Sequence, residues 1–246
     1  MRWLRYFLKC LLGGFIAIQI YFVLQIAIWA VVNPSSTAFQ RAERWRLCGL
    51  HISCSVQSSW VPYDKISANV KRAVLVSEDD IFFQHMGVRV EDMQKAWAKN
   101  AQQNSGKSKV ALRGGSTITQ QLAKNLFLSS EQNYFRKAQE LMITGLLETM
   151  LSKQRLYEIY LNSVEWGEGI FGIGAASQHY YGIKPALLDR EQAAALASAL
   201  PAPKCFDKAQ YCRKANIHFP TRQQFILENM DRVALSPIQK SKSSKN

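Results

Sequence analysis

The chain has 246 residues, 48% of them apolar, and its 31 Lys and Arg against 18 Asp and Glu give a formal charge of +13. This length supports one hydrophobic core with a small annex, and the charge indicates an anionic partner: a nucleic acid, an acidic membrane surface or a phosphorylated substrate. No internal repeat and no nucleic-acid-binding motif stands out. A nucleic-acid function would therefore rest on charge alone, and we expect no nucleic-acid partner.

The N-terminal segment predicts one membrane-spanning helix. Residues 10–32 contain no charged side chain and, at about 1.5 Å per residue, span roughly 34 Å, enough for the ~30 Å hydrocarbon layer. The basic residues before it are Arg2, Arg5 and Lys9. By the positive-inside rule they hold residues 1–9 in the cytoplasm and direct the rest of the chain outside. The alternative, a cleaved signal peptide, has a shorter apolar region of about 7–15 residues.

Residues 33–60 predict a connecting neck, because a Pro-Ser-Ser-Thr cluster and mixed charges replace any sustained periodicity. Two pairs of cysteines are close in sequence, Cys48 with Cys54 and Cys205 with Cys212. They allow two local disulfides in an oxidising space. The paired Cys-x-x-Cys spacing of structural zinc is absent, so we expect no metal-binding or catalytic role for the cysteines, whether free or bonded.

Helical patterns dominate the domain expected over residues 61–235, and a disordered basic tail is expected over 236–246. Apolar residues recur at helical spacing over 66–74 and 143–151. The Ala-rich stretch 190–200 is another strong helix former. There is no convincing alternating strand, so the sequence predicts a mostly α domain.

Glu78 lies on an apolar helix face. Val70, Val74 and Glu78 are four residues apart, so the carboxylate continues the apolar stripe near the end of the helix. A partly desolvated carboxylate of this kind suits general acid or base chemistry. The alternative is a surface glutamate beyond the helix end, with Asp79 and Asp80 simply solvated.

Glu140 repeats this arrangement, because it continues the apolar stripe of its own helix. Arg136 and Lys137 come just before it. An Arg–Glu pair one turn apart is commonly a structural salt bridge, whereas a basic pair beside an acid on an apolar face also suits a phosphate or a metal ion. Glu148 is a competing acid further along, and spacing alone does not choose between them.

The segment LRGGSTITQQLAKNLF, residues 112–127, places two glycines and several uncharged polar side chains at the start of a helix. Thr117 and Gln120 have the spacing of a capping box, which by itself describes an ordinary capped helix. However, Thr117, Gln121 and Lys124 share one helix face, and a Gly-rich loop before a helix N-terminus forms an anion site. This combination suits a diphosphate with adjacent sugar hydroxyls, and the P-loop pattern is absent.

Together these segments resemble the five ordered motifs of the peptidoglycan glycosyltransferases. The matching stretches are EDDIFFQH (78–85), GGSTITQQLAKN (114–125), RKAQE (136–140), YEIYLNSVEWGEGIFGIGAASQHYYG (157–182) and REQAAALASALPAP (190–203). The resemblance covers about residues 61–235. With one N-terminal anchor, the chain is most similar to the monofunctional, membrane-anchored type.

The resemblance implies a lysozyme-like helical lobe and a small membrane-proximal jaw lobe, here at about residues 88–112. It implies an enzyme that polymerises lipid II, a disaccharide-pentapeptide on undecaprenyl pyrophosphate, into glycan strands with inversion at the donor's anomeric carbon. The implied partners are lipid II, the growing lipid-linked glycan, the membrane and, further, proteins of cell division or elongation. The implied location is the bacterial inner membrane, with the catalytic domain in the periplasm.

The resemblance also assigns residues. Glu78 matches the general base that deprotonates the acceptor 4-hydroxyl, and Glu140 matches the second essential acid, beside the donor pyrophosphate. The other matching positions bind substrate: Asp79, Phe82, His85, Ser116, Thr117, Gln121, Lys124, Arg136 and Lys137. No tightly bound cofactor is implied, and a divalent cation, Mg or Mn, near Glu140 is left open.

Two departures from the family pattern affect these expectations. Many relatives carry a basic residue where this chain has Gln132, which weakens the expected donor site, and the segment 204–212 differs from the commoner ending. The polar stretch 102–110 predicts a mobile loop over the cleft. Two alternatives remain open: a lytic enzyme of similar fold, which has no need of gathered cations, and an anchored scaffold with a degenerate site.

Overall fold

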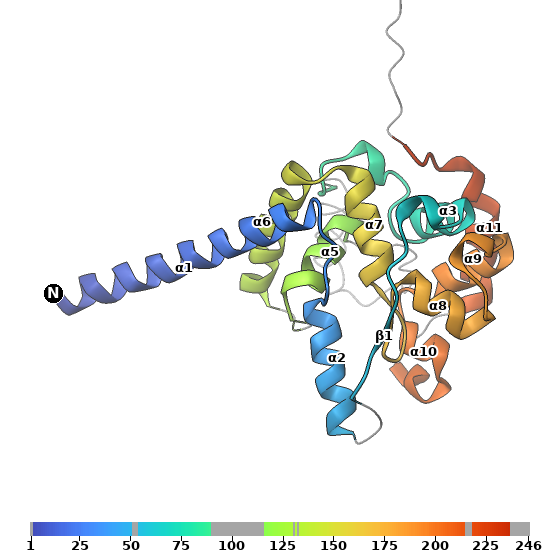
Figure 1. Ribbon diagram of the computed structural model, residues 1–246, viewed down its shortest axis with the longest axis horizontal. Coiled ribbons are helices and arrows are strands. Elements are labelled where there is room, and N and C mark those ends of the chain that lie inside the picture. Colours follow the sequence, from blue (N-terminus) through green and yellow to red (C-terminus); the bar gives the residue numbers. More distant parts are fainter. Residues whose placement is uncertain are drawn as a thin grey trace, which may run out of the picture.

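The structure is a computed structural model that describes residues 2–50, 54–89, 116–129, 131, 133–214 and 218–236 (Figure 1). Several expectations lie outside the described residues. They concern the jaw from residue 90 onward, the loop over 102–110, the glycines at 114 and 115, Gln132, and the tail from residue 237.

Helices make up most of the described chain, which confirms the prediction of a mostly α fold. The α-helices are α1 (Arg2–Trp29), α2 (Ala38–Gly49), α3 (Ala68–Glu78), α5 (Ile118–Phe127), α6 (Tyr134–Met150), α7 (Lys153–Ser163), α8 (Gly172–Tyr181), α9 (Arg190–Ala199), α10 (Pro203–Asp207) and α11 (Phe219–Asn229). The short 3-10 helices are η1 (Tyr63–Lys65), η2 (Phe82–Gln84), η4 (Pro185–Leu187), η5 (Ala209–Lys214) and η6 (Met230–Arg232).

A small sheet lies among the helices. Its strands are β1 (Gln57–Ser58), β2 (Glu165–Gly167) and β3 (Ile170–Phe171), in the order β1-β3-β2. β1 pairs with β3 in parallel and β2 pairs with β3 antiparallel. Strands of two or three residues are too short to show an alternating pattern, which is why the sequence did not predict them.

Two groups of helices share the core. α3 packs against α9 and α11, while α5 packs against α6 and α7, and α7 also contacts α8. Figure 1 shows the α5–α6 group toward the anchor and the α3, α9 and α11 group on the opposite side. The aromatic side chains of Tyr157, Tyr160 and Trp166 are fully buried in this core. The two groups meet where the last residue of α3, Glu78, contacts Gln121 of α5.

The N-terminal helix α1 is the one described helix long and apolar enough to cross a membrane. Most of its large apolar side chains are exposed, but Phe22, Ile26 and Trp29 are buried. These three residues share one helix face, and the rings of Phe22 and Trp29 contact Phe127 of α5 with centroids 4.9 and 5.0 Å apart. Arg155 fastens the helix end, because its Nε donates to the Trp29 carbonyl at 2.9 Å. The end of the anchor is thus part of the core.

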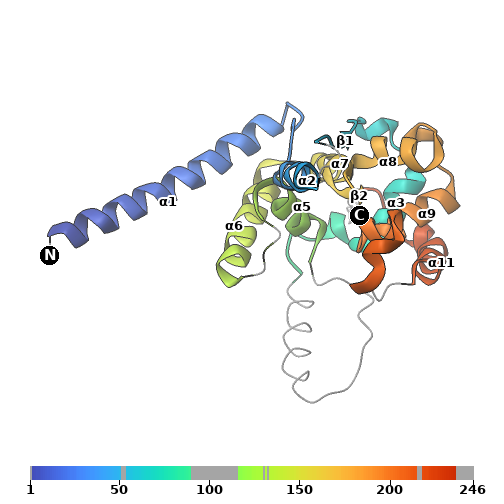
Figure 2. The same cartoon turned by 90° about the horizontal axis from the view of Figure 1, so that it is seen from below.

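The helix α2 lies inside the segment for which the sequence predicted a connecting neck. It begins with a capping box formed by Thr37 and Gln40, and it packs against α5, as Figures 1 and 2 show from two directions. Its C-terminal end is joined to the chain after it by the Cys48–Cys54 disulfide. This part of the neck is therefore built into the lobe.

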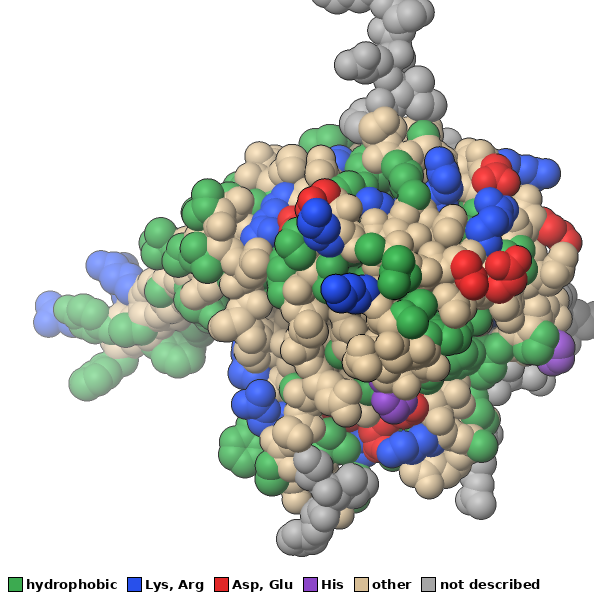
Figure 3. Space-filling view, turned by 45° about the vertical axis from the view of Figure 1, so that its right-hand side comes forward, with side chains coloured by type: hydrophobic (Ala, Val, Ile, Leu, Met, Phe, Trp, Pro, Cys, Tyr) green, Lys and Arg blue, Asp and Glu red, His purple; other side chains and the backbone are tan. Residues whose placement is uncertain are grey.

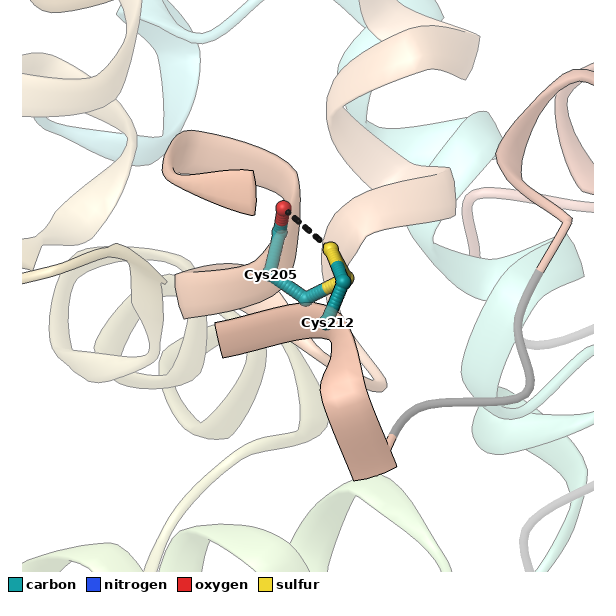
Figure 4. Close-up of a disulfide and its surroundings, with 2 residues drawn as sticks. All are labelled: Cys205 and Cys212. Atoms are coloured by element: carbon teal, nitrogen blue, oxygen red, sulfur yellow. Dashed lines mark hydrogen bonds between the residues drawn. A yellow bond between two sulfur atoms is a disulfide. The ribbon is translucent and has the colours of Figure 1, made fainter. Parts of the chain in front are cut away.

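The second pair of neighbouring cysteines is also bonded. Cys205 in α10 forms a disulfide with Cys212 in η5, and Figure 4 shows the Cys212 sulfur directed toward the Cys205 carbonyl, 3.1 Å away. The remaining cysteine, Cys10, is free and exposed on α1. Both disulfides close short loops, so they hold local geometry rather than joining distant elements.

Candidate active site

Glu78 is the last residue of α3, and its carboxylate is held from two sides. Its Oε1 accepts a hydrogen bond from the Ser77 hydroxyl at 2.8 Å, and its Oε2 accepts one from the Gln121 amide at 2.9 Å. The side chain is 11% exposed. Val70 and Val74 are buried on the same helix face, so the predicted continuation of the apolar stripe is confirmed. A carboxylate fixed in this way keeps free lone pairs with which to accept a proton.

Gln121 connects Glu78 to the core. While its Nε2 donates to Glu78, its Oε1 accepts from the Tyr160 hydroxyl at 3.0 Å. Burial raises the pKa of Tyr160 well above its ordinary value of 10, so the phenol stays protonated and donates. The relay from Tyr160 through Gln121 fixes which end of the amide faces the carboxylate.

Sequence reasoning missed Arg222, which approaches Glu78 from α11. Its guanidinium donates to the Ser77 hydroxyl at 2.9 Å and lies 3.8 Å from Glu78 Oε1. The Nε of Arg222 is buried and has no hydrogen-bond partner among the described residues. No sequence signal connects positions 78 and 222, because the contact depends on the packing of α11 against α3.

Asp79 lies behind the site. Its side chain is fully buried and accepts hydrogen bonds from His85 Nε2 at 2.9 Å and from the backbone N–H of Ile118 at 3.1 Å. His85 Nδ1 accepts from the Gly87 N–H, so the ring carries its proton on Nε2. A carboxylate at the N-terminal end of α5 is also favoured by the helix dipole. Asp79 therefore fixes the end of α3 against the start of α5.

Phe82 is also fully buried, with its ring 5.5 Å from that of Tyr157. Thr117 forms the predicted capping box with Gln120, and its hydroxyl donates to the Gly87 carbonyl at 2.6 Å. Gly87 has φ +77, and a Cβ there would lie 2.7 Å from the Glu148 side chain. The loop after α3 is therefore held tightly against α5 and α6.

Ser116, immediately before the capping residue, is half-buried. Its backbone carbonyl accepts a second, longer hydrogen bond from Gln121 Nε2, at 3.4 Å. Ser116 and Gln121 thus lie near Glu78, at the start of the same helix that carries Lys124.

A cluster of cations surrounds Glu140, the second predicted acid. Glu140 is buried on α6, where its carboxylate accepts from Arg136 at 2.8 Å and from the Lys137 ammonium. Lys124 of α5 interacts electrostatically with all three of these groups. Three cations and one carboxylate leave a formal charge of +2 (3 − 1). This cluster is suited to an anion.

Two donors of this cluster remain free for a ligand. Lys124 forms no ion pair with any residue that the structure describes, and burial lowers the pKa of its ammonium group, partly opposed by the charge of Glu140. Arg136 Nε is buried and has no hydrogen-bond partner among the described residues. Buried donors without partners are unusual in proteins and indicate a missing acceptor.

Glu148, the alternative to Glu140 as the second acid, is occupied by contacts with other residues. Its Oε1 accepts from the Thr119 hydroxyl at 2.5 Å and from the Lys153 ammonium at 2.8 Å. The side chain is 3% exposed. These contacts give Glu148 a structural role between α5, α6 and α7.

No group of three or more His, Cys, Asp or Glu side chains in the described ranges is placed to hold a metal ion. Both oxygens of Glu140, the residue near which the resemblance leaves a divalent cation open, already accept from cations. Any metal bound there would have to share Glu140 with Arg136 and Lys137 or draw ligands from a bound anion.

The described residues thus place a fixed carboxylate, Glu78, at the end of α3 and a cation-rich cluster around Glu140 on α5 and α6. A base beside an anion site can deprotonate one substrate while stabilising negative charge on another.

Comparison with known proteins agrees with this geometry. The Transglycosylase family matches residues 50–231. The chain is 58% identical over 236 residues to the biosynthetic peptidoglycan transglycosylase of Cupriavidus metallidurans, covering 96% of this chain and 99% of that one. It is 52% identical over 236 residues to the protein of the same description from Ralstonia nicotianae, with the same coverage. The chain is a member of the transglycosylase family.

Proposed function

We propose that this enzyme polymerises lipid II into peptidoglycan strands by inverting glycosyl transfer, in the biogenesis of the cell wall. The observation that carries the proposal is the carboxylate of Glu78, which is held by Gln121 and interacts with Lys124 of the cation cluster, a lysine with no ion-pair partner in the described chain. The relatives described as biosynthetic peptidoglycan transglycosylases support the same reaction.

Glu78 acts as the general base. It removes the proton of the acceptor's 4-hydroxyl, and the oxygen attacks the anomeric carbon of the donor sugar, so that the bond to the lipid pyrophosphate breaks with inversion. Ser77 and Gln121 each donate to one carboxylate oxygen, which orients the base while leaving lone pairs free for the incoming proton.

Lys124, Arg136 and Lys137 bind the donor diphosphate. Negative charge on this leaving group grows in the transition state, so cations placed around it lower the barrier. Glu140 holds Arg136 and Lys137 in position through its two oxygens. Ser116, which is half-buried just before α5, adjoins this group, and Thr117, whose buried hydroxyl caps α5, positions the start of that helix.

Asp79, Phe82 and His85 serve the site by positioning rather than by touching substrate. Asp79 and Phe82 have fully buried side chains, and His85 is committed to Asp79. The family motif that contains them therefore joins the base to the start of α5.

The proposed location is the bacterial inner membrane, with residues 1–9 inside and the domain in the periplasm. α1 is apolar and long enough to cross a membrane, and two disulfides favour an oxidising compartment. The proposed partners are lipid II, its growing glycan and proteins of division or elongation. A divalent cation, Mg or Mn, is proposed to act with the diphosphate near Glu140.

The test uses the full chain purified in detergent and incubated with lipid II, with and without Mg or Mn. Products are resolved by size, with Glu78→Gln and the exposed control Glu228→Gln assayed in parallel. We expect a ladder of glycan strands from the wild type and from Glu228→Gln and none from Glu78→Gln.

Other outcomes would overturn the proposal. Intact lipid II with the wild-type enzyme would favour an anchored scaffold. Shortening of preformed glycan would show a lytic enzyme. A ladder of undiminished rate from Glu78→Gln would place the base elsewhere.

A further inference from the structure

The helix between the anchor and the domain supplies an aromatic side chain to the cation cluster. Phe39 of α2 lies over Lys124 of α5, with the Lys124 Nζ 5.5 Å from the ring centroid. This distance is within the range of a cation–π interaction. Phe39 is half-buried, so its ring covers the lysine without being part of the hydrophobic core.

The position of α2 is fixed by contacts with distant parts of the chain. Glu43 accepts from Lys204 of α10 at 2.5 Å, and Arg46 donates to Glu168, just beyond β2, at 2.6 Å. Gln40 Nε2 also donates to the Ser58 hydroxyl of β1 at 3.4 Å. Two ion pairs, to Lys204 and Glu168, and a hydrogen bond to β1 therefore fix the position of the helix that carries Phe39.

Lys124 also interacts electrostatically with charged groups of two other elements. Glu140, Arg136 and Lys137 belong to α6, and Glu78 ends α3. Burial is the largest effect on this lysine and lowers its pKa, with Arg136 and Lys137 acting in the same direction and Glu140 and Glu78 opposing it. Lys124 is thus half-buried among the described elements, and Phe39 is its aromatic neighbour.

We propose that Phe39 is a positioning residue for Lys124. On this proposal α2 forms part of the donor site and does not merely connect α1 to the domain. The proposal rests on the assignment of Lys124 to the donor diphosphate. By covering the ammonium group, the ring limits its hydration and its rotamers before substrate arrives.

This arrangement strengthens the attraction between Lys124 and an anion. The desolvation of the lysine is imposed by folding, so substrate binding does not incur it. Charge interactions are also stronger where water is excluded. Phe39→Ala would admit water to Lys124 and release its side chain.

The experiment compares Phe39→Ala and Phe39→Tyr with a control on the same helix, Trp45→Ala, since Trp45 is 78% exposed. Lysines of the full chain in detergent are ¹³C-dimethylated, and the Lys124 signal is assigned by its loss in Lys124→Arg. Its pKa is then read by NMR titration. kcat and KM for lipid II are measured on unmodified samples of the same variants, and thermal melting checks that each is folded.

In Phe39→Ala we expect the Lys124 pKa to move toward its ordinary value and KM for lipid II to rise about three- to ten-fold, with a smaller change in kcat. Phe39→Tyr and Trp45→Ala should resemble the wild type in both measurements. An unchanged Lys124 pKa in Phe39→Ala would overturn the proposal, even if KM rose. So would a Phe39→Tyr variant, folded by melting, that behaved as Phe39→Ala. Failure of the wild type to use lipid II would refute the proposed function instead, and the pKa arm would still decide whether Phe39 shields Lys124.

Discussion

Glu165 on β2 provides a pH-dependent term in the stability of the fold. Its side chain is 18% exposed, and its nearest cation is Lys204, 3.5 Å away. Burial raises the pKa of Glu165 from 4.5 to about 7, because the charged form loses more hydration than Lys204 returns. The folded protein therefore binds a proton here more tightly than the unfolded chain does.

The sign follows from this difference in pKa. Below pH 4.5 both states are protonated at Glu165 and its stabilising contribution is fully present, and that contribution is lost as the pH rises through about 7. At 1.36 kcal/mol per pKa unit, the change from 4.5 to about 7 corresponds to about 3 kcal/mol. Residual solvent exposure reduces this value, and we expect about 2 kcal/mol at pH 8.

Glu165→Gln removes the buried charge while keeping an oxygen in place. We expect it to raise the melting temperature at pH 8 by roughly 4–8 °C and to change it little at pH 5, since about 1 kcal/mol corresponds to ~2–4 °C in a domain of this size. The assay is thermal melting of the full chain in detergent at pH 5, 6, 7 and 8, with the exposed Glu228→Gln as control. A destabilised Glu165→Gln at pH 8 would show that Lys204 stabilises the Glu165 anion. An equal shift at pH 5 and pH 8 would show that the effect does not depend on the charge of Glu165. Either result would refute the reasoning.

Three further predictions concern the site and its supports. Gln121→Leu should slow strand formation about ten-fold, because Glu78 loses a donor and the buried Tyr160 hydroxyl loses its acceptor; an unchanged kcat would show that the relay does not orient the base. Asp79→Asn should lower the free energy of unfolding by about 1.5–3 kcal/mol through its hydrogen bonds to the start of α5 and to the histidine ring, and urea denaturation with wild-type stability would contradict it. Reduction of the two disulfides should cost about 2 kcal/mol each, as expected for short loops, and melting with and without reductant measures this, with no shift as the contrary result.

The positions of the candidate site residues could be predicted because the sequence patterns that reveal them involve residues close together in the chain. Apolar spacing placed Glu78 and Glu140 on buried helix faces, and the capping box fixed the start of α5 at Thr117. The pair between Arg136 and Glu140 follows from their one-turn spacing. Each of these inferences depends on residues within two or three turns of one another.

The supports of the site were not predictable, because they depend on contacts between distant residues. Arg222 reaches Ser77 across 145 positions, and Lys204 reaches Glu43 across 161. The helix α2 gave no apolar periodicity because it buries Gln40 and Glu43. These side chains find partners partly within the helix region, at Thr37 and Arg46, and partly at the remote Ser58 and Lys204. Sequence patterns identify an apolar face, but they do not identify a polar face whose partners come from elsewhere.

The C-terminal end of α1 packs in the core of the domain, and this fixes how far the domain can lie from the membrane. Phe22, Ile26 and Trp29 belong to the core, and Gln19 forms hydrogen bonds with Gln139 of α6. The part of the uncharged stretch from residue 10 that stands clear of the domain therefore ends by Ile18, at most about 14 Å of helix. That length is shorter than the ~30 Å hydrocarbon layer, so a span that begins at residue 10 leaves no spacer between the membrane and the domain. A domain joined to its membrane span without a linker cannot move away from the bilayer or rotate relative to the span. With the location and the lipid-linked substrate proposed above, substrates would arrive by lateral diffusion and the product would move past a stationary site.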